Sequence, residues 1–188
     1  FQGRNVGTAH IRGAEAEAIK DVGPVRITAT LLYTVGDQQL NDVHLDVRHS
    51  VPGCTSREQF KGVLYGKGRA VFDGRIEVRE HAGGSVAHLN NANLLLSRKA
   101  EVDTKPQLEI HADDVKCSHG ATVGELDPAQ LFYLRSRGID AGAARRLLCL
   151  GFAREILDRC PIAPLREHVE SAVAARLAPA AHSGTGAS

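Results

Sequence analysis

A cysteine and a histidine lie two residues apart, as Cys117 and His119, in a stretch punctuated by glycine. Side chains at positions i and i+2 of a β-strand leave the same face, so this thiol and imidazole can reach one ion or one partner surface. Sulfur and imidazole nitrogen are suitable ligands for iron, zinc or an iron–sulfur cluster. The spacing therefore indicates a candidate metal or cluster site.

Two donors do not complete such a site, because closed metal sites and clusters use four ligands and no CxxC or HxxxH accompanies this pair. The alternative is a small buried cysteine beside a hydrogen-bonded histidine at the end of a strand. Val115 shares the strand parity of the pair. If Val115 points inward, we expect Cys117 and His119 to do the same unless Gly120 or a bulge redirects the chain.

Short apolar runs with a period of two extend from about Val25 to Val123, with glycine and asparagine between them. In one of these runs Val43, Leu45 and Val47 share a face. Many short strands of this kind predict an all-β domain. Periodicity alone leaves a sandwich and a solenoid open. The sequence Asp73-Gly74 fits either a hairpin turn or a corner of a solenoid coil.

The last third of the chain has helical signals. Asp127 followed by Pro128 predicts a helix start, and Gly138 predicts its end. Asp140 caps a second predicted helix that extends to Arg159. A third amphipathic helix is predicted from apolar residues at every fourth position, namely Leu165, Val169, Val173 and Leu177.

Composition excludes several classes of protein. The 188 residues carry a net charge of +1 with both signs mixed, so no basic block marks a nucleic-acid surface. No apolar run reaches the roughly 18 residues that a membrane span needs. The scattered cysteines, Cys54, Cys117, Cys149 and Cys160, fit a reducing cytoplasm better than a disulfide framework.

Several longer sequence segments occur in one order: Gly62–Gly74, Asn93–Ser97, Ala100–Ile110 and Asp113–Gly138. Together they resemble the SufB/SufD family of the SUF iron–sulfur cluster assembly machinery, and its SufD branch in particular. The stretch from Thr104 to Gly138 is the most specific part. The SufB pattern has an acidic residue after the matching histidine, where this chain has Gly120.

The resemblance implies a right-handed parallel β-helix followed by a small C-terminal α-helical domain. Members of the family are about twice as long, so we expect a C-terminal core or a natural short form. The expected organisation is a tag remnant at 1–3, an N-terminal cap or linker at 4–24, a β-helix core at 25–126, a helical domain at 127–178 and a disordered tail at 179–188.

The resemblance also implies a function. We expect a cytoplasmic, non-catalytic subunit of the SUF scaffold that pairs with SufB and docks the SufC ATPase, supporting cluster assembly or iron delivery. His119 and Cys117 would lie at the subunit junction, where iron or an iron–sulfur cluster binds transiently, and the isolated chain would hold no tightly bound cofactor.

The predicted contact with SufC lies on the C-terminal helices, with candidate residues Tyr133, Arg135, Arg137, Arg145, Arg146 and Arg154. The alternative is that most of these arginines only solvate a helical face. Two further hypotheses remain open: a metal-dependent enzyme with Cys117 and His119 as ligands, and a homodimer formed in isolation through a free strand edge.

Overall fold

The computed structural model describes residues 24–159 and 162–177. The expected tag remnant, the expected cap up to residue 23 and the expected tail lie outside these ranges, as does Cys160. In the described part the chain divides into two compact units between Gly124 and Glu125, a β unit and a helical unit.

The β unit consists of strands of equal length, each of ten residues, joined by short corners. They are β1 (Arg26–Val35), β2 (Leu40–His49), β3 (Thr55–Leu64), β4 (Arg69–Val78), β5 (Val86–Leu95), β6 (Glu101–Ile110) and β7 (Lys116–Glu125). In β4, for example, buried and partly exposed residues alternate, so one face of the strand lies in the core.

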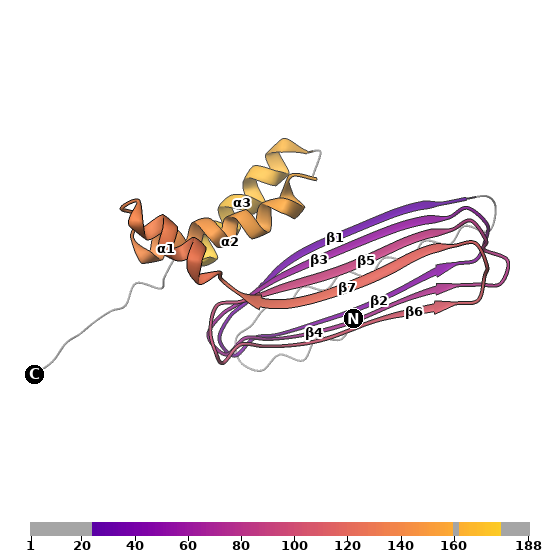
Figure 1. Ribbon diagram of the computed structural model, residues 1–188, viewed down its shortest axis with the longest axis horizontal. Coiled ribbons are helices and arrows are strands. Elements are labelled where there is room, and N and C mark those ends of the chain that lie inside the picture. Colours follow the sequence, from indigo (N-terminus) through magenta and orange to yellow (C-terminus); the bar gives the residue numbers. More distant parts are fainter. Residues whose placement is uncertain (1–23, 160–161, 178–188) are drawn as a thin grey trace, which may run out of the picture. The chain divides into compact units, whose positions relative to one another are not determined.

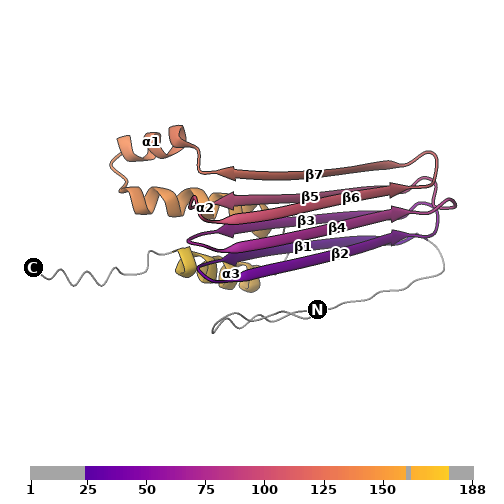
Figure 2. The same ribbon diagram turned by 90° about the horizontal axis from the view of Figure 1, so that it is seen from below.

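Successive strands lie in two sheets (Figure 1), ordered β1-β3-β5-β7 and β2-β4-β6. The pairing is parallel and in continuous register: Arg26 aligns with Thr55, and Thr55 aligns with Val86. The chain therefore coils, adding one strand to each sheet per turn, and Figure 2 shows these coils stacked. The predicted parallel β-helix is confirmed. The sandwich alternative is wrong, because the strands pair in parallel, whereas the sheets of a β-sandwich are antiparallel.

Both interpretations of Asp73-Gly74 are wrong, because the two residues lie inside β4 rather than at a turn or corner. A Cβ built on Gly74 would lie 2.6 Å from Cζ of Phe72. The glycine is there to make room for the phenylalanine ring inside the coil, not to turn the chain. Corners use glycine with positive φ instead, as at Gly66 and Gly84.

The interior of the coil is apolar over much of its length, with Phe72, Ile76 and Val78 fully buried. The rings of Phe60 and Phe72 pack with centroids 4.7 Å apart. Because aromatic residues are few, most of the core consists of aliphatic side chains stacked coil upon coil.

A row of polar side chains also crosses the interior. The Tyr33 hydroxyl donates to Asn93 Oδ1 two coils away. Gly62 is aligned with both residues on the coil between them, so the tyrosine side chain crosses above this glycine. Asn93 donates to Asn91 Oδ1 at 3.1 Å, and Asn91 donates to Thr104 Oγ1 at 2.8 Å. These bonds satisfy buried polar groups and fix the alignment of the coils.

The helical unit contains α1 (Pro128–Ser136), α2 (Ala141–Leu157) and α3 (Ala163–Leu177). The predicted caps are confirmed: Asp127 accepts from the Ala129 N–H at 2.8 Å, and Asp140 accepts from the Ala143 N–H at 2.9 Å. The second helix ends at Leu157, two residues before the predicted Arg159.

Candidate functional site

The fourth strand of the first sheet, β7, carries both residues of the candidate metal site and has a free edge. It pairs with β5 on one side only, and no described strand pairs with the other side. The Lys116 N–H donates to Ser85 O at 3.0 Å, so the amides of even-numbered residues face β5. The amides of Cys117, His119 and Ala121 therefore point away from the sheet and are open to another strand.

Cys117 points into the coil, as its parity with Val115 predicted. Both residues pack against the core cluster that contains Leu89, and the Cys117 side chain is half-buried. Burial raises the pKa of its thiol, and a hydrogen bond with the Ala87 backbone partly opposes this rise. The thiol form is therefore favoured, and binding a metal through Sγ requires release of a proton.

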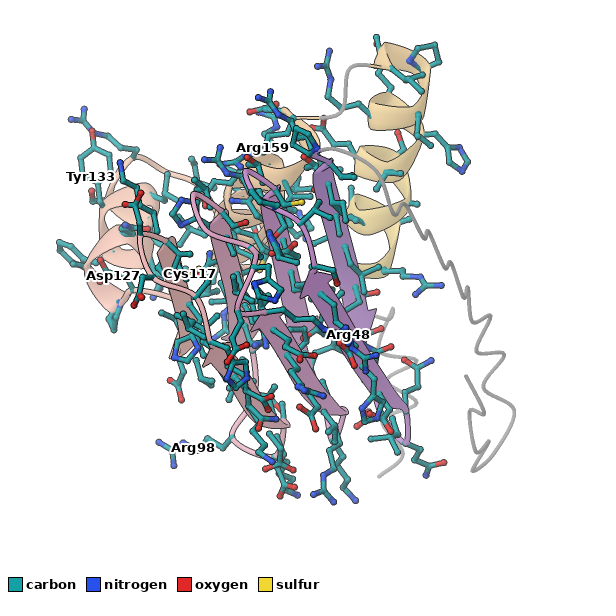
Figure 3. All side chains as sticks on the ribbon, turned by 90° about the vertical axis from the view of Figure 1, so that its right-hand side faces the viewer. Arg48, Arg98, Cys117, Asp127, Tyr133 and Arg159 are labelled. Carbon is teal, nitrogen blue, oxygen red and sulfur yellow. The ribbon has the colours of Figure 1, made fainter. Side chains whose placement is uncertain are left out.

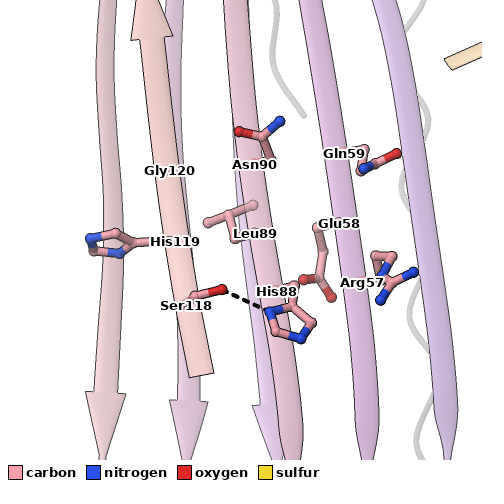
Figure 4. Close-up of a pocket in the computed structure, with 9 residues that line it drawn as sticks. All are labelled: Arg57, Glu58, Gln59, His88, Leu89, Asn90, Ser118, His119 and Gly120. Carbon is pink, nitrogen blue, oxygen red and sulfur yellow. Dashed lines mark hydrogen bonds between the residues drawn. The ribbon is translucent and has the colours of Figure 1, made fainter. Parts of the chain in front are cut away.

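His119 is exposed, although it shares the inward parity of Cys117. No described strand covers the coil beyond β7, so a side chain on the inner face of this strand still meets solvent. Figure 4 shows the imidazole and the Ser118 hydroxyl on opposite sides of the strand. The structure therefore places Cys117 and His119 together on one face, at the open end of the coil, where both can meet a partner surface.

The two side chains do not form a closed metal site by themselves. Among residues 24–159 and 162–177, no group of three or more histidine, cysteine, aspartate or glutamate residues could hold a metal. Two donors at an open edge fit a shared site that is completed by ligands from another chain. Figure 3 shows Cys117 on its strand at the end of the sheet.

The outer face of the same strand borders a hollow of about 440 Å³, which the sequence did not reveal. Its lining includes Arg57, His88 and Ser118 from three neighbouring strands (Figure 4). His88 Nδ1 and Ser118 Oγ share a hydrogen bond of 2.7 Å. These residues are 30 positions apart, so no local spacing could have predicted their contact.

The second sheet ends differently, because its terminal strand β6 carries Pro106. The Glu101 N–H donates to Gly68 O, so odd-numbered amides of β6 face β4 and position 106 faces outward. Proline therefore removes one outward donor from this edge. Charged residues occupy its outer face, where Asp103 pairs with Arg69 at 2.8 Å. By contrast, β7 has no proline, and from Ser118 to Gly124 its only titratable residue is His119.

The candidate SufC-contact residues are not equally available on the helical unit. Tyr133 is 57% exposed, and Arg137 lies over its ring at 5.3 Å from the centroid. Arg154 contacts Glu170 on α3, with a Nε–Oε1 distance of 3.1 Å, so it joins two helices. This contact between α2 and α3 explains the arginine at position 154 without any contact to a partner protein.

The remaining candidate arginines lie on α1 and α2, where Arg135 and Arg145 are exposed and Arg146 is half-buried. Phe132, for which the sequence carries no functional signal, is 75% exposed beside Tyr133. Leu147 is also 49% exposed. An exposed aromatic pair on one short helix is a typical feature of a protein-binding surface.

Residues 24–152 match the family described as the SUF system FeS cluster assembly, SufBD core domain. The chain therefore belongs to the SufBD family of the SUF system. It is 46% identical over 136 residues to the iron–sulfur cluster assembly protein SufD of Escherichia coli, and 36% identical over 112 residues to SufD of Bacillus subtilis. It is thus a SufD-type component.

A SufBD family iron–sulfur cluster assembly protein of Synechocystis is 40% identical over 145 residues. These alignments cover 72%, 60% and 77% of the chain for the Escherichia, Bacillus and Synechocystis relatives, respectively. They cover only 32%, 26% and 32% of the relatives, so the chain spans about a third of their length or less. Separately, no helix in the described part is both long and apolar enough to cross a bilayer.

Proposed function

We propose that the chain is a non-catalytic scaffold subunit for iron–sulfur cluster assembly that pairs with SufB through the free edge of β7. The observation that carries the proposal is the position of Cys117 and His119 on this unpaired terminal strand. Membership in a cluster assembly family supports the chemistry, because thiolate and imidazole are ligands for iron and its clusters.

Pairing is proposed at β7 rather than β6 for a physical reason. An incoming strand needs a continuous row of backbone donors and acceptors, and β7 offers outward amides at His119, Ala121 and Val123. Pro106 interrupts the corresponding row on β6. Strand addition at β7 would also bring partner side chains next to the imidazole of His119.

In this arrangement the cluster or iron is cargo that two subunits hold in common. His119 supplies a nitrogen ligand at the edge, and Cys117 supplies a sulfur ligand from the inner face. The raised pKa of the Cys117 thiol means that the sulfur binds after losing a proton, so we expect loading to weaken as the pH falls. The partner supplies the remaining ligands.

Docking of the SufC ATPase is proposed on α1 and α2, centred on the exposed Phe132 and Tyr133 rather than on the arginines alone. Aromatic side chains contribute most to binding when they become buried in a partner pocket, whereas exposed charges contribute little. Arg135 and Arg145, at the rim of this surface, then attract SufC by their charge and help to orient it.

The experiment that tests the pairing replaces one outward amide. Ala121→Pro removes a donor from the free edge and leaves the ladder to β5 intact, whereas Ala121→Gly keeps the donor. We expect the proline variant to lose at least tenfold in affinity for SufB, measured with the purified proteins, and the glycine variant to bind almost as the parent does. Equal affinity of the parent and the Ala121→Pro variant would contradict pairing at β7.

The alternative function, a metal-dependent enzyme with Cys117 and His119 as ligands, predicts a stoichiometric metal in the isolated chain. Metal analysis of the purified chain distinguishes it from the scaffold.

A further inference from the structure

The outer face of the first sheet carries positive charge and no carboxylate of its own. Its outward positions on β1, β3, β5 and β7 alternate with the positions that face the interior. They include the exposed cations Arg26, Arg57 and Lys116. Every residue of these four strands is described, and none of their outward positions holds aspartate or glutamate. This face therefore favours an anionic ligand over a cationic one.

The outer face of the second sheet differs, because its arginines lie beside carboxylates. Arg48 contacts Asp46 at 2.8 Å, and Arg75 contacts Glu109 at 2.7 Å. Such pairs compensate the positive charge within the face itself. By contrast, Arg57 on the first sheet has no carboxylate partner among the described residues. Its guanidinium group is therefore available to a ligand.

The hollow beside β7 brings polar side chains from three strands into one row. Arg57 on β3 is aligned with His88 on β5. The hydrogen bond of 2.7 Å between His88 Nδ1 and Ser118 Oγ continues the row onto β7. Figure 4 shows the His88 ring between the side chains of Arg57 and Ser118. Because neighbouring strands lie about 4.8 Å apart, one small ligand can contact Arg57 and His88 together.

A second row of residues extends the hollow along the strands. Gln59 on β3 is aligned with Asn90 on β5, and both line the hollow with Gly120 of β7. Gly120 has no side chain to fill the space beside the Asn90 amide. The volume of about 440 Å³ lies within the range of roughly 300–1,000 Å³ that is typical of small-molecule sites.

Hydrogen-bond donors dominate the lining. The Arg57 guanidinium donates in a planar fork, and the amide groups of Gln59 and Asn90 can donate as well. When the Ser118 hydroxyl donates to His88 Nδ1, the ring proton lies on Nε2, which becomes a further donor.

The one carboxylate among the described residues of the lining belongs to Glu58, and it does not oppose an anion there. Glu58 has no exposed surface and shares the inner face of β3 with the core residue Phe60. Neither of its carboxyl oxygens bonds to a described residue, so Glu58 does not occupy the Arg57 guanidinium.

We propose that this hollow is a binding site for an oxyanion of the phosphate type. The fork of Arg57 pairs with two of its oxygens, and His88 Nε2 donates to a third. A carboxylate has two oxygens, which the guanidinium alone would occupy. The tetrahedral phosphate group uses donors from two strands at once and therefore fits this row better. Ser118 acts as a positioning residue, because its hydroxyl holds the His88 ring.

The test is a calorimetric titration of the purified chain with inorganic phosphate, with chloride used to keep the ionic strength constant. We expect saturable binding, accompanied by a shift of the His88 ring signals in NMR spectra. Succinate, a dicarboxylate, should bind more weakly under the same conditions. Absence of saturable phosphate binding, or tighter binding of succinate than of phosphate, would overturn the proposal.

Variants at position 57 separate a defined site from general attraction between charges. We expect Arg57→Gln to weaken phosphate binding about tenfold, because the bidentate contact is lost. Arg57→Lys keeps the charge without the planar fork and should lose most of the same affinity. Arg48→Gln removes one exposed positive charge from the second sheet and is the matched control, which should bind as the parent does. Equal losses in Arg57→Gln and Arg48→Gln would refute the site.

His88→Ala tests the second donor of the row. Removing the imidazole leaves the Arg57 fork in place, so we expect a smaller loss of phosphate affinity than in Arg57→Gln. Unchanged affinity in His88→Ala would contradict the contact assigned to Nε2.

Discussion

At the scale of single residues, packing inside the coil depends on glycines within the strands as well as on the apolar side chains. Gly62 and Gly74 lie in the middle of strands, where the ring of a neighbour occupies the space of their Cβ atoms. In the sequence, glycine at such positions looks like a break between short runs. The apolar runs read from the sequence are therefore shorter than the strands. Each of these glycines is needed for a contact between residues that are far apart in the sequence.

Gly62 provides a direct test of this packing. A Cβ at Gly62 would lie 2.4 Å from both Asn93 Oδ1 and Tyr33 Cε2, so Gly62→Ala must displace the hydrogen bond between these residues. We expect the free energy of unfolding to fall by about 1–3 kcal/mol in a urea titration. Gly124→Ala is the matched control, since nothing lies within 4 Å of its Cβ. Equal stability of the two variants would contradict the packing role.

The candidate site was partly predictable at this scale. Strand parity alone predicted that Cys117 and His119 share a face, and that Cys117 points inward if Val115 does. Nothing local predicted that His119 stays exposed, because that depends on the absence of a described strand beyond β7. The burial of Glu58 was equally hidden, since a glutamate in an alternating run gives no sign that it occupies a core position.

At the scale of elements, the starts of α1 and α2 and the end of α1 followed from the sequence, because caps are local. Asp127, Asp140 and Gly138 act through bonds and backbone angles within a few residues. The exposed faces of the same helices could not be predicted from the sequence. A phenylalanine in a helix is normally expected in the core, yet Phe132 is the most exposed of the large hydrophobic residues described.

The exposure of Phe132 carries a prediction about α1. Phe132→Asp should reduce capture of SufC at least tenfold in a pull-down with purified proteins, because an aromatic contact would be replaced by a charge. Leu165→Asp on α3 is the control, since Leu165 is 48% exposed and should have little effect. Retention of SufC by the Phe132→Asp variant, or equal losses in the two variants, would contradict docking through α1.

At the scale of the whole molecule, a sandwich and a β-helix share the two-residue period, so the alternation of apolar residues could not separate them. The difference lies in which strands pair, and that is a long-range property. The resemblance of the segments between Gly62 and Gly138 to the SufB/SufD family made the distinction, and the parallel pairing confirms it. A stacked coil must end in an edge, and the proposed pairing with SufB uses that edge.

The most direct test of the account measures iron content and cluster absorbance after reconstitution of the chain with SufB and SufC. We expect His119→Ala to lose most of the bound cluster, while Ser118→Ala, changed on the opposite face of the same strand, retains it. Both variants should still bind SufB, because neither removes a backbone donor. Full cluster loading of the His119→Ala complex would contradict the role assigned to the imidazole at the edge of β7.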